Sequence, residues 1–395
     1  MATKGDVWDK GGADLYVIRQ LLSLHDRYPH RVHFLMGNRD INKLRIVDEL
    51  GVFSKEDTSN LPFHGGVYWL RGTNLRGDPD QTTTLVPHER TERLKWMLQK
   101  TMGSADAFEL RRCELERERI AFKNSTSAAP SLYSNNLEKR KTRTGVTDDE
   151  VSRSYIVSCN PNDGIMSQYL SRAKLTIKFG SALFMHGALP FLPDKSTMCF
   201  PTPWLTEDED NRDSSCKTSS LTDWIRSLNQ FASDQIGAWQ EYGLGIKHAD
   251  VKQHEGVWAT EGGYSNNTLG GKAFGKLLQY GMNTLPDKTK NQSIVYSSWM
   301  KDGMPREDIQ YHHWCDFFEK HGLQLIATGH QPVGDMPWPI QIQSQDNLST
   351  KHWIIPCDTS FSGDTCWVNL DDFDDRRVNL GRGSGSSGRG DVAMW

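Results

Sequence analysis

The sequence predicts an α/β fold with polar side chains in the loops at strand ends. Near the start of the chain, a stretch with helical spacing of apolar residues is followed by a short apolar run. Further along, apolar runs at 175–185, 323–328 and 353–356 each end at polar residues. Helices that alternate with buried strands are typical of α/β architectures, and loops beside their strand ends commonly carry the chemistry.

The first helix and strand follow from the residue pattern. Apolar residues between 15 and 22 recur three and four positions apart, which predicts an amphipathic helix that runs to about His25. Pro29 ends this helix because proline cannot continue it. Val32–Met36 then predicts a short buried strand that leads into Gly37. The order loop, helix, strand, loop is that of an α/β crossover.

The remaining chain is expected to form a single domain over residues 1–395 with long polar insertions. Within residues 51–175 we expect partly helical, highly charged sequence, with a solvated helix face at Arg111–Lys123 and a mobile loop at Asn124–Glu150. The other segments of distinct composition are a second insertion at 201–320, which includes a helix around Trp224–Trp239, and a flexible Gly-rich linker at 381–390.

Composition limits the classes of partner and compartment. The net charge of −4 gives no electrostatic argument for binding nucleic acid or an anionic membrane. Seven scattered cysteines without a Cys-x-x-Cys pair argue against a disulfide framework and favour a reducing compartment. No apolar run approaches about 18 residues, and the first residues do not resemble a signal peptide. We therefore expect a cytoplasmic protein; the sequence leaves the oligomeric state open.

Two short motifs suggest metal chemistry. The first runs from Gly5 to Gly11 as Gly-Asp-Val-Trp-Asp-Lys-Gly, and the second, Gly-Asn-Arg-Asp, runs from Gly37 to Asp40. An aspartate able to bridge two metals, followed by an asparagine at the next strand end, is typical of a dinuclear phosphoesterase site. Two histidines follow later strand-like runs, so the candidate metal ligands are Asp6, Asn38, His186 and His330.

The donor types and the neighbouring charges indicate which ions and ligands such a site would take. Carboxylate, amide oxygen and two imidazoles suit Mn, Fe or Zn better than Mg or Ca. Two such ions about 3.5–4 Å apart would activate a shared water and clamp a phosphoryl group. Lys10 and Arg39 are candidates to bind phosphate oxygens, because both are cationic and arginine offers a bidentate fork. Asp9 and Asp40 are candidates to orient the ligands or Arg39.

The ordered set Gly-Asp-x-x-Asp-Lys-Gly, Gly-Asn-Arg-Asp, apolar-His-Gly and Thr-Gly-His-x-Pro resembles the calcineurin-like metallophosphoesterase superfamily. This superfamily includes the Ser/Thr phosphoprotein phosphatases. The resemblance implies a four-layer α/β/β/α sandwich and hydrolysis of a phosphorylated small molecule or phosphoprotein. Asp6 would match the bridging aspartate, and Asn38, His186 and His330 would complete one metal site.

Three departures from the family pattern keep an alternative open. None of the 13 histidines has an Asp two positions before it, so the family's first motif, Asp-x-His, and its strand are not found. The family's Asp-Arg-Gly is Asp-Lys-Gly here, and Arg39 replaces the histidine that protonates the leaving group. The alternative is therefore a truncated or inactive member that acts as a binding or scaffold module. A nucleotide or dinucleoside polyphosphate hydrolase would differ only in substrate.

Each site residue also has a purely structural interpretation. Asp6 and Asn38 can be turn residues, and His186 or His330 can be a buried, hydrogen-bonded histidine. His64, which also precedes a glycine, competes with His186 for the ligand role, but it follows a proline in a loop rather than a strand. The segment 270–276 has the spacing of a phosphate-binding loop but lacks its Ser/Thr and a preceding strand, so we interpret it as a chance match.

Overall fold

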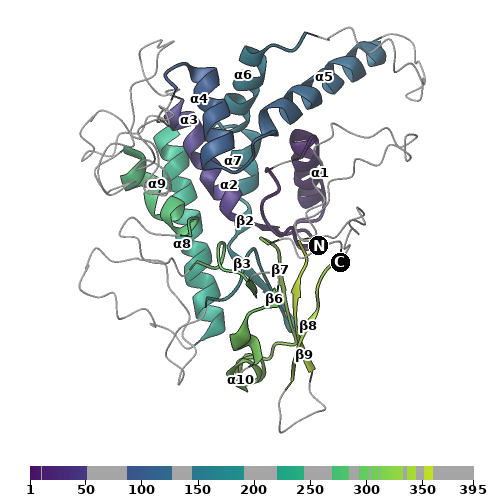
Figure 1. The fold of residues 1–395 in the computed structure, drawn as a ribbon, viewed down its shortest axis with the longest axis vertical. Helices are drawn as coiled ribbons and strands as arrows, with labels where there is room; N and C mark the ends of the chain where they lie inside the picture. Colours follow the sequence, from purple (N-terminus) through teal and green to yellow (C-terminus); the bar gives the residue numbers. More distant parts are fainter. Residues whose placement is uncertain are drawn as a thin grey trace, which may run out of the picture.

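The computed structural model describes residues 1–9, 11–50, 87–126, 145–190, 220–243, 269–283, 293–301, 304–310, 312–331, 336–343 and 351–358. This part of the chain combines helices with mixed sheets, as the α/β prediction requires. Figure 1 shows the helices of the first half gathered at one end of the molecule, with the largest sheet and helix α10 toward the other.

The N-terminal residues form the predicted crossover. Ala2 bridges His33 in parallel, and helix α1 (Asp14–Arg27) connects the two extended segments. The four apolar residues that predicted this helix are all buried. Strand β1 (Phe34–Leu35) is shorter than predicted, and the residues that flank it, Val32 and Met36, are buried as expected for the predicted run. The crossover thus brings the two motif loops to the same edge.

A chain of short helices starts directly at the second motif. Helix α2 (Asn38–Asn42) is followed by the 3₁₀ turn η1 (Lys43–Arg45) and helix α3 (Ile46–Glu49). The apolar side chains of these three short elements are fully buried, so the second motif is anchored in the core rather than in a surface loop. Asn38 is therefore the first residue of a buried helix.

Among the residues that the structure describes between 87 and 170 are four further helices and one π-helical turn. They are α4 (Arg90–Trp96), the π-helical turn η3 (Met97–Thr101), α5 (Ala107–Thr126), α6 (Asp148–Ser158) and α7 (Ile165–Leu170). The apolar stripe expected in this region, Leu94, Met97 and Leu98, is fully buried. Thr147 Oγ1 caps α6 by accepting a hydrogen bond from the Glu150 N–H at 3.3 Å, and Glu150 Oε2 accepts one from the Thr147 N–H at 2.8 Å.

The prediction of a solvated helix face at Arg111–Lys123 is wrong for two of its residues. Arg111 and Glu114 are only 1% and 3% exposed. The Arg111 guanidinium lies 5.2 Å from the Trp8 ring centroid and 4.4 Å from that of Tyr155. A guanidinium can be buried when aromatic faces and an acid surround it, and charge counting along the sequence does not show those partners.

A five-stranded sheet brings together three predicted strand regions. Its order is β3-β4-β7-β9-β8, with β4, β7 and β9 parallel and the two edge strands antiparallel to their neighbours. The strands are β3 (Thr176–Phe179), β4 (Ala182–Met185), β7 (Leu325–Thr328), β8 (Ile340–Gln343) and β9 (Lys351–Pro356). The region 175–185 is thus a hairpin rather than one strand, with Gly180 at positive φ in its turn. Strand β2 (Ala173–Lys174) pairs separately with β1.

Helix α8 (Leu221–Gly243) confirms the helix expected around Trp224–Trp239 and packs on α9 (Leu269–Tyr280). The other elements are β5 (Met300–Lys301), β6 (Met304–Pro305), η6 (Glu307–Gln310) and α10 (His312–Lys320). The segment 270–276 lies inside α9, and a helix interior has no loop to surround a phosphate group.

Two further sequence expectations concern cysteines and membranes. Cys113 is disulfide-bonded, which argues against the expected reducing compartment, while Cys159, Cys315 and Cys357 are free and buried. Among the helices that the structure describes, none is both long and apolar enough to cross a bilayer.

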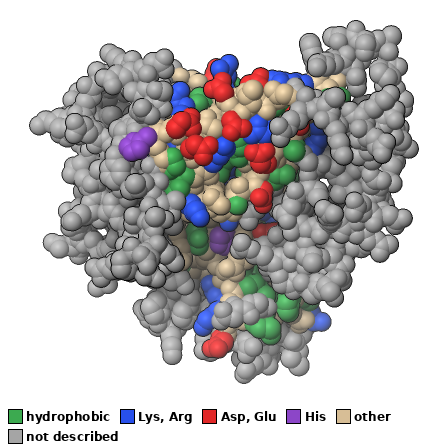
Figure 2. Space-filling view, turned by 45° about the horizontal axis from the view of Figure 1, so that its top comes forward, with side chains coloured by type: hydrophobic (Ala, Val, Ile, Leu, Met, Phe, Trp, Pro, Cys, Tyr) green, Lys and Arg blue, Asp and Glu red, His purple; other side chains and the backbone are tan. Residues whose placement is uncertain are grey.

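Figure 2 shows acidic and basic side chains intermingled on one face, and ion pairs such as Lys95–Asp148 at 2.7 Å occur on the surface. The predicted linker 381–390, the competing His64 and Lys10 lie outside the described residues.

Candidate metal centre

Four strand ends bring the candidate ligands to one place. Asp6 comes shortly after the bridge at Ala2, and Asn38 lies three residues beyond β1. His186 directly follows β4, and His330 lies two residues beyond the adjacent parallel strand β7. Because parallel strands end at the same edge of a sheet, the two histidines become neighbours despite their separation in the sequence.

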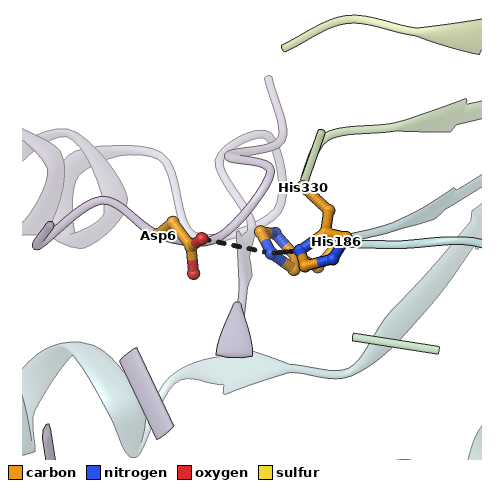
Figure 3. A group of neighbouring side chains, drawn as sticks. All are labelled: Asp6, His186 and His330. Carbon is orange, nitrogen blue, oxygen red and sulfur yellow. Dashed lines mark hydrogen bonds and ion pairs between the residues drawn. The ribbon is translucent and has the colours of Figure 1, made fainter. Parts of the chain in front are cut away.

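The predicted ligands form one compact group. His186 Nε2 lies 3.3 Å from Asp6 Oδ2 and 3.3 Å from His330 Nδ1. Asn38 Oδ1 lies 3.1 Å from His186 Nε2 and 3.2 Å from His330 Nδ1. Figure 3 shows the Asp6 carboxylate facing the two imidazole rings. The structure thus brings together all four residues that the sequence selected as metal ligands.

The backbone at two of these residues is held in an unusual conformation. Asp6 and His330 have φ of 53° and 73°, in the left-handed region that residues other than glycine seldom adopt. Such a conformation costs free energy and persists only where surrounding contacts fix it. At Gly37 the approach is so close that an added Cβ would lie 2.0 Å from Asp6 Oδ1. The glycine before Asn38 is therefore required by the packing of the two motif loops.

The second nitrogen of His186 is fixed by the backbone. Nδ1 lies 2.5 Å from the carbonyl oxygen of Lys4, an arrangement in which Nδ1–H donates and Nε2 faces the other three side chains. Metal-binding histidines typically make such a bond through the nitrogen that does not bind the metal. Among the contacts of these four side chains, this one agrees best with a metal-binding role.

The local charges favour an ionised Asp6 next to His186. Burial opposes ionisation, but His186, His330 and Arg39 together hold the pKa of Asp6 well below its usual range. For His186, burial is outweighed by the charge and hydrogen bond of Asp6, which raise the pKa to about 9, so a bound ion would have to displace the proton on Nε2. Burial and the adjacent His186 lower the pKa of His330 to about 3, so His330 is neutral, as a metal-binding imidazole must be.

The two candidate orienting acids have different partners. Asp40 is 1% exposed, and its Oδ2 accepts hydrogen bonds from the backbone N–H groups of Asp6 and Gly37. Burial and the charge of Asp6 raise the pKa of Asp40 to about 6. Asp9 Oδ1 lies 3.5 Å from Arg39 Nη1 and 3.8 Å from Lys43 Nζ. Asp40 thus supports the Asp6 backbone, while Asp9 lies beside Arg39.

Arg39 is connected to the metal ligands through its own backbone. Its N–H donates to Asp6 Oδ1 at 2.9 Å, which leaves Oδ2 of Asp6 toward His186. The guanidinium Nη1 donates to the carbonyl oxygen of Met102. Arg39 also contributes to the low pKa of Asp6, which places its charge near the group of donors.

The sequence interpretation missed one aromatic neighbour of the site. The ring centroid of Tyr296 lies 5.0 Å from that of His330. Tyr296 belongs to a turn at 293–299 that accepts hydrogen bonds from the N–H groups of Gly187 and Ala188 through its carbonyl oxygens. This turn lies within the predicted second insertion, and no motif marks it. The glycine at position 187 is the one weak sign in the sequence that another segment packs closely here. An added Cβ would lie 2.5 Å from the backbone of the turn.

Comparisons of the chain with protein-family models, with curated proteins and with solved structures found no match. The chemistry of the site therefore follows from its own residues. Among the residues described, Asp6, His186 and His330 are the one group of three or more acidic, histidine or cysteine side chains placed to hold an ion, with donor atoms within 4.8 Å of one another. Asn38 adds an amide oxygen to this group.

Proposed function

We propose that the chain is a metal-dependent phosphoester hydrolase of the calcineurin-like metallophosphoesterase superfamily. The observation that supports the proposal is the convergence of Asp6, Asn38, His186 and His330, which come from four loops far apart in the sequence. These side chains place their donor atoms about 3 Å apart, close enough to share one ion. The order of the motifs and this geometry point to the same chemistry.

The donor set defines the kind of ion. Asp6 Oδ2, Asn38 Oδ1, His186 Nε2 and His330 Nδ1 would hold a divalent cation, and two nitrogens with two oxygens suit Mn, Fe or Zn. Such an ion would supply an activated water and positive charge for phosphoryl oxygens. A complete family site holds two ions, and the described donors form one group; a second ion needs donors beyond it.

The surrounding residues would act by positioning and charge. A guanidinium is a fixed cation with five N–H donors, so Arg39 would bind phosphate oxygens and stabilise developing charge rather than act as the general acid. Asp40 fixes the Asp6 backbone and Asp9 accompanies Arg39. Lys10 is proposed as a further phosphate ligand on the basis of its motif alone.

The arrangement of the sheets supports the finer fold proposal. The small sheet of β1 and β2, extended by the bridge between Ala2 and His33, carries two of the ligands at its edge. The five-stranded sheet carries the other two. Two sheets that meet at a metal site are what a four-layer α/β/β/α sandwich requires. We propose this architecture, with a phosphorylated small molecule or phosphoprotein as substrate.

The test is Mn²⁺-dependent hydrolysis of p-nitrophenyl phosphate by wild type, Asp6→Asn and the control Asp26→Asn, with metal content measured by elemental analysis. Asp26 is 61% exposed and is paired with Arg172 at 3.3 Å, outside the site. We expect turnover by wild type and by Asp26→Asn, and a loss of at least about 100-fold in Asp6→Asn. Equal activity in all three proteins would remove the proposed site.

A non-catalytic binding or scaffold role is the second candidate. Two observations favour it: Arg39 stands where the family has its general acid, and the described donors make one ion site rather than two. Bound metal that requires Asp6, without turnover of p-nitrophenyl phosphate, nucleotides or dinucleoside polyphosphates, would support this role. Turnover with two ions per chain would exclude it.

A further inference from the structure

The π-helical turn η3 and the residues after it lie against helix α2, which starts in the second motif, and against the turn η1 that follows it. Asn42 Nδ2 donates to the carbonyl oxygen of Thr101 at 3.0 Å, and Arg45 Nη2 donates to Thr101 Oγ1 at 3.2 Å. All three side chains are buried. π-Helical turns are uncommon and occur frequently next to functional sites. The turn therefore has a fixed position relative to α2, and so do the residues that follow it.

Those following residues, Met102–Ser104, contact both motif loops; we call this segment the arginine anchor. The carbonyl oxygen of Met102 accepts a hydrogen bond from Arg39 Nη1. Ser104 Oγ donates to Asp9 Oδ1 at 2.5 Å, and that oxygen lies 3.5 Å from the same Nη1. One nitrogen of the guanidinium is thus held by a carbonyl and a carboxylate.

Gly103 leaves the space that this arrangement needs. Its φ is 61°, and a Cβ at this position would lie 2.7 Å from Arg39 Nη1 and 3.2 Å from Nη2. Any side chain here would push the guanidinium away from the Met102 carbonyl. The close approach and the positive φ both favour glycine.

The other edge of the guanidinium remains available. Within the part of the chain that the structure describes, Nε and Nη2 of Arg39 make no hydrogen bond, and the side chain is 22% exposed. The Nε and Nη2 hydrogens form a planar fork that matches two oxygens of a phosphate group. An arginine held through Nη1 alone keeps this fork and loses the freedom to swing away from it.

We propose that the arginine anchor positions Arg39 so that its Nε–Nη2 edge binds the tetrahedral oxyanion of a phosphate ester beside the metal donors. The inference rests on the proposed function and extends it, because it assigns a role to a segment that carries no sequence motif. Met102, Gly103 and Ser104 are positioning residues that act through Arg39 and do not touch the substrate. The anchor sets affinity for the oxyanion and leaves metal binding unchanged.

The experiment measures binding of inorganic phosphate to the full chain loaded with Mn²⁺, by calorimetry, with metal content measured in parallel. The test variant is Gly103→Ala, and the matched control is Gly322→Ala. Gly322 has nearly the same φ, 60°, but an added Cβ there meets nothing within 4 Å. Both variants carry the same backbone strain, so only the contact with Arg39 differs. We expect phosphate binding at least about tenfold weaker in Gly103→Ala than in the control, since a charge-assisted bidentate contact is lost.

A second pair of variants shows whether the effect passes through Arg39. In an Arg39→Gln background, Gly103→Ala should cause no further loss of phosphate affinity, because the group it displaces is gone. Ser104→Ala removes the hydrogen bond to Asp9 without filling space and should weaken phosphate binding a few-fold. If Gly103→Ala does not fold, the Ser104→Ala result alone tests the role of the anchor.

The outcomes separate this inference from the function on which it rests. Wild type that binds Mn²⁺ but no phosphate overturns the phosphoesterase proposal itself. Wild type that binds phosphate, with Gly103→Ala equal to Gly322→Ala or Ser104→Ala equal to wild type, overturns the anchor and leaves that proposal intact. A further loss in the Arg39→Gln background, or a fall in metal content in Gly103→Ala, shows that the segment acts on the fold rather than on Arg39.

Discussion

Asp40 fixes the backbone of Asp6 through a hydrogen bond: Asp40 Oδ2 accepts one from the Asp6 N–H at 2.8 Å and another from the Gly37 N–H at 2.9 Å. A single buried carboxylate oxygen thus joins the two motif loops. Since Asp6 has a φ of 53°, this contact contributes to keeping a strained residue in place. Two replacements at position 40 separate the hydrogen bonds from the charge.

Asp40→Ala leaves two buried N–H groups without an acceptor, whereas Asp40→Asn retains an oxygen that can serve both. We expect Asp40→Ala to lower Mn²⁺ affinity by about 10–100-fold, as for other residues that orient a ligand, and to destabilise the fold by about 2 kcal/mol or more. Asp40→Asn should show a clearly smaller loss of Mn²⁺ affinity and of folding stability. Metal titration and urea unfolding measure the two effects, and identical behaviour of the two variants would contradict the role given to this oxygen.

Gly37→Ala tests the close approach of the two motif loops. The added Cβ would lie 2.0 Å from Asp6 Oδ1 and 2.5 Å from the Asp6 nitrogen, so the ligand must move. We expect loss of Mn²⁺ binding. Gly237→Ala is the control, since Gly237 lies in α8 with nothing within 4 Å of an added Cβ. The control should retain metal and gain about 0.5–1 kcal/mol of stability from helix propensity. Metal binding by Gly37→Ala at the wild-type level would show that the loops can separate.

The elements predicted from the sequence are those whose pattern is local. Helix α1 and the strands before His186 and His330 have apolar residues at helical spacing or in short runs, and their burial follows from that pattern alone. Asn38, His186 and His330 were identifiable because each follows such an element, and Asp6 because it lies in a Gly-rich motif. Within each sheet, the ligands become neighbours because parallel segments end at a common edge, whereas the meeting of the two sheets has no local signal in the sequence.

Contacts between distant segments had no such signal. Arg111 looks like one charge in a solvated run, and the partners that explain its burial include the aromatic rings of Trp8 and Tyr155, which are distant in the sequence. Tyr296 reaches His330 from a region with no motif. Met102 contributes a carbonyl oxygen, which any residue would supply. Side-chain identity therefore cannot predict such partners; tertiary packing selects them.

A buried ion pair gives a prediction for pH. Arg45 Nε lies 2.5 Å from Glu49 Oε1, and both side chains are 0% exposed. Burial raises the pKa of Glu49 from 4.5 to about 7, against the charges of Arg45 and Arg93, and Asp48 adds to the rise. The folded chain therefore binds this proton more tightly than the unfolded chain does. It follows that the contribution of Glu49 to stability falls as pH rises from about 4.5 to about 7.

Glu49→Gln should remove this dependence, because glutamine keeps an oxygen acceptor for Arg45 and does not titrate. We expect wild type to lose stability relative to Glu49→Gln by up to about 3 kcal/mol between pH 4.5 and pH 7.5, at about 1.4 kcal/mol for each unit of pKa shift. Urea unfolding of both proteins across that range measures the difference. Curves that stay parallel would show that Glu49 titrates at the same pH in the folded and unfolded chains.

The last prediction concerns the amide oxygen that lies between the two histidines. Asn38 Oδ1 is 3.1 Å from His186 Nε2 and 3.2 Å from His330 Nδ1, where it can share an ion with both. Asn38→Leu has a similar shape without the oxygen and should lower Mn²⁺ affinity at least about tenfold, whereas Asn38→Asp offers a charged oxygen to the cation and should bind at least as tightly as wild type. Competition with a fluorescent chelator ranks the three proteins, and urea unfolding confirms that each is folded. Wild-type affinity in folded Asn38→Leu would exclude Asn38 from the ligands and leave a three-residue site.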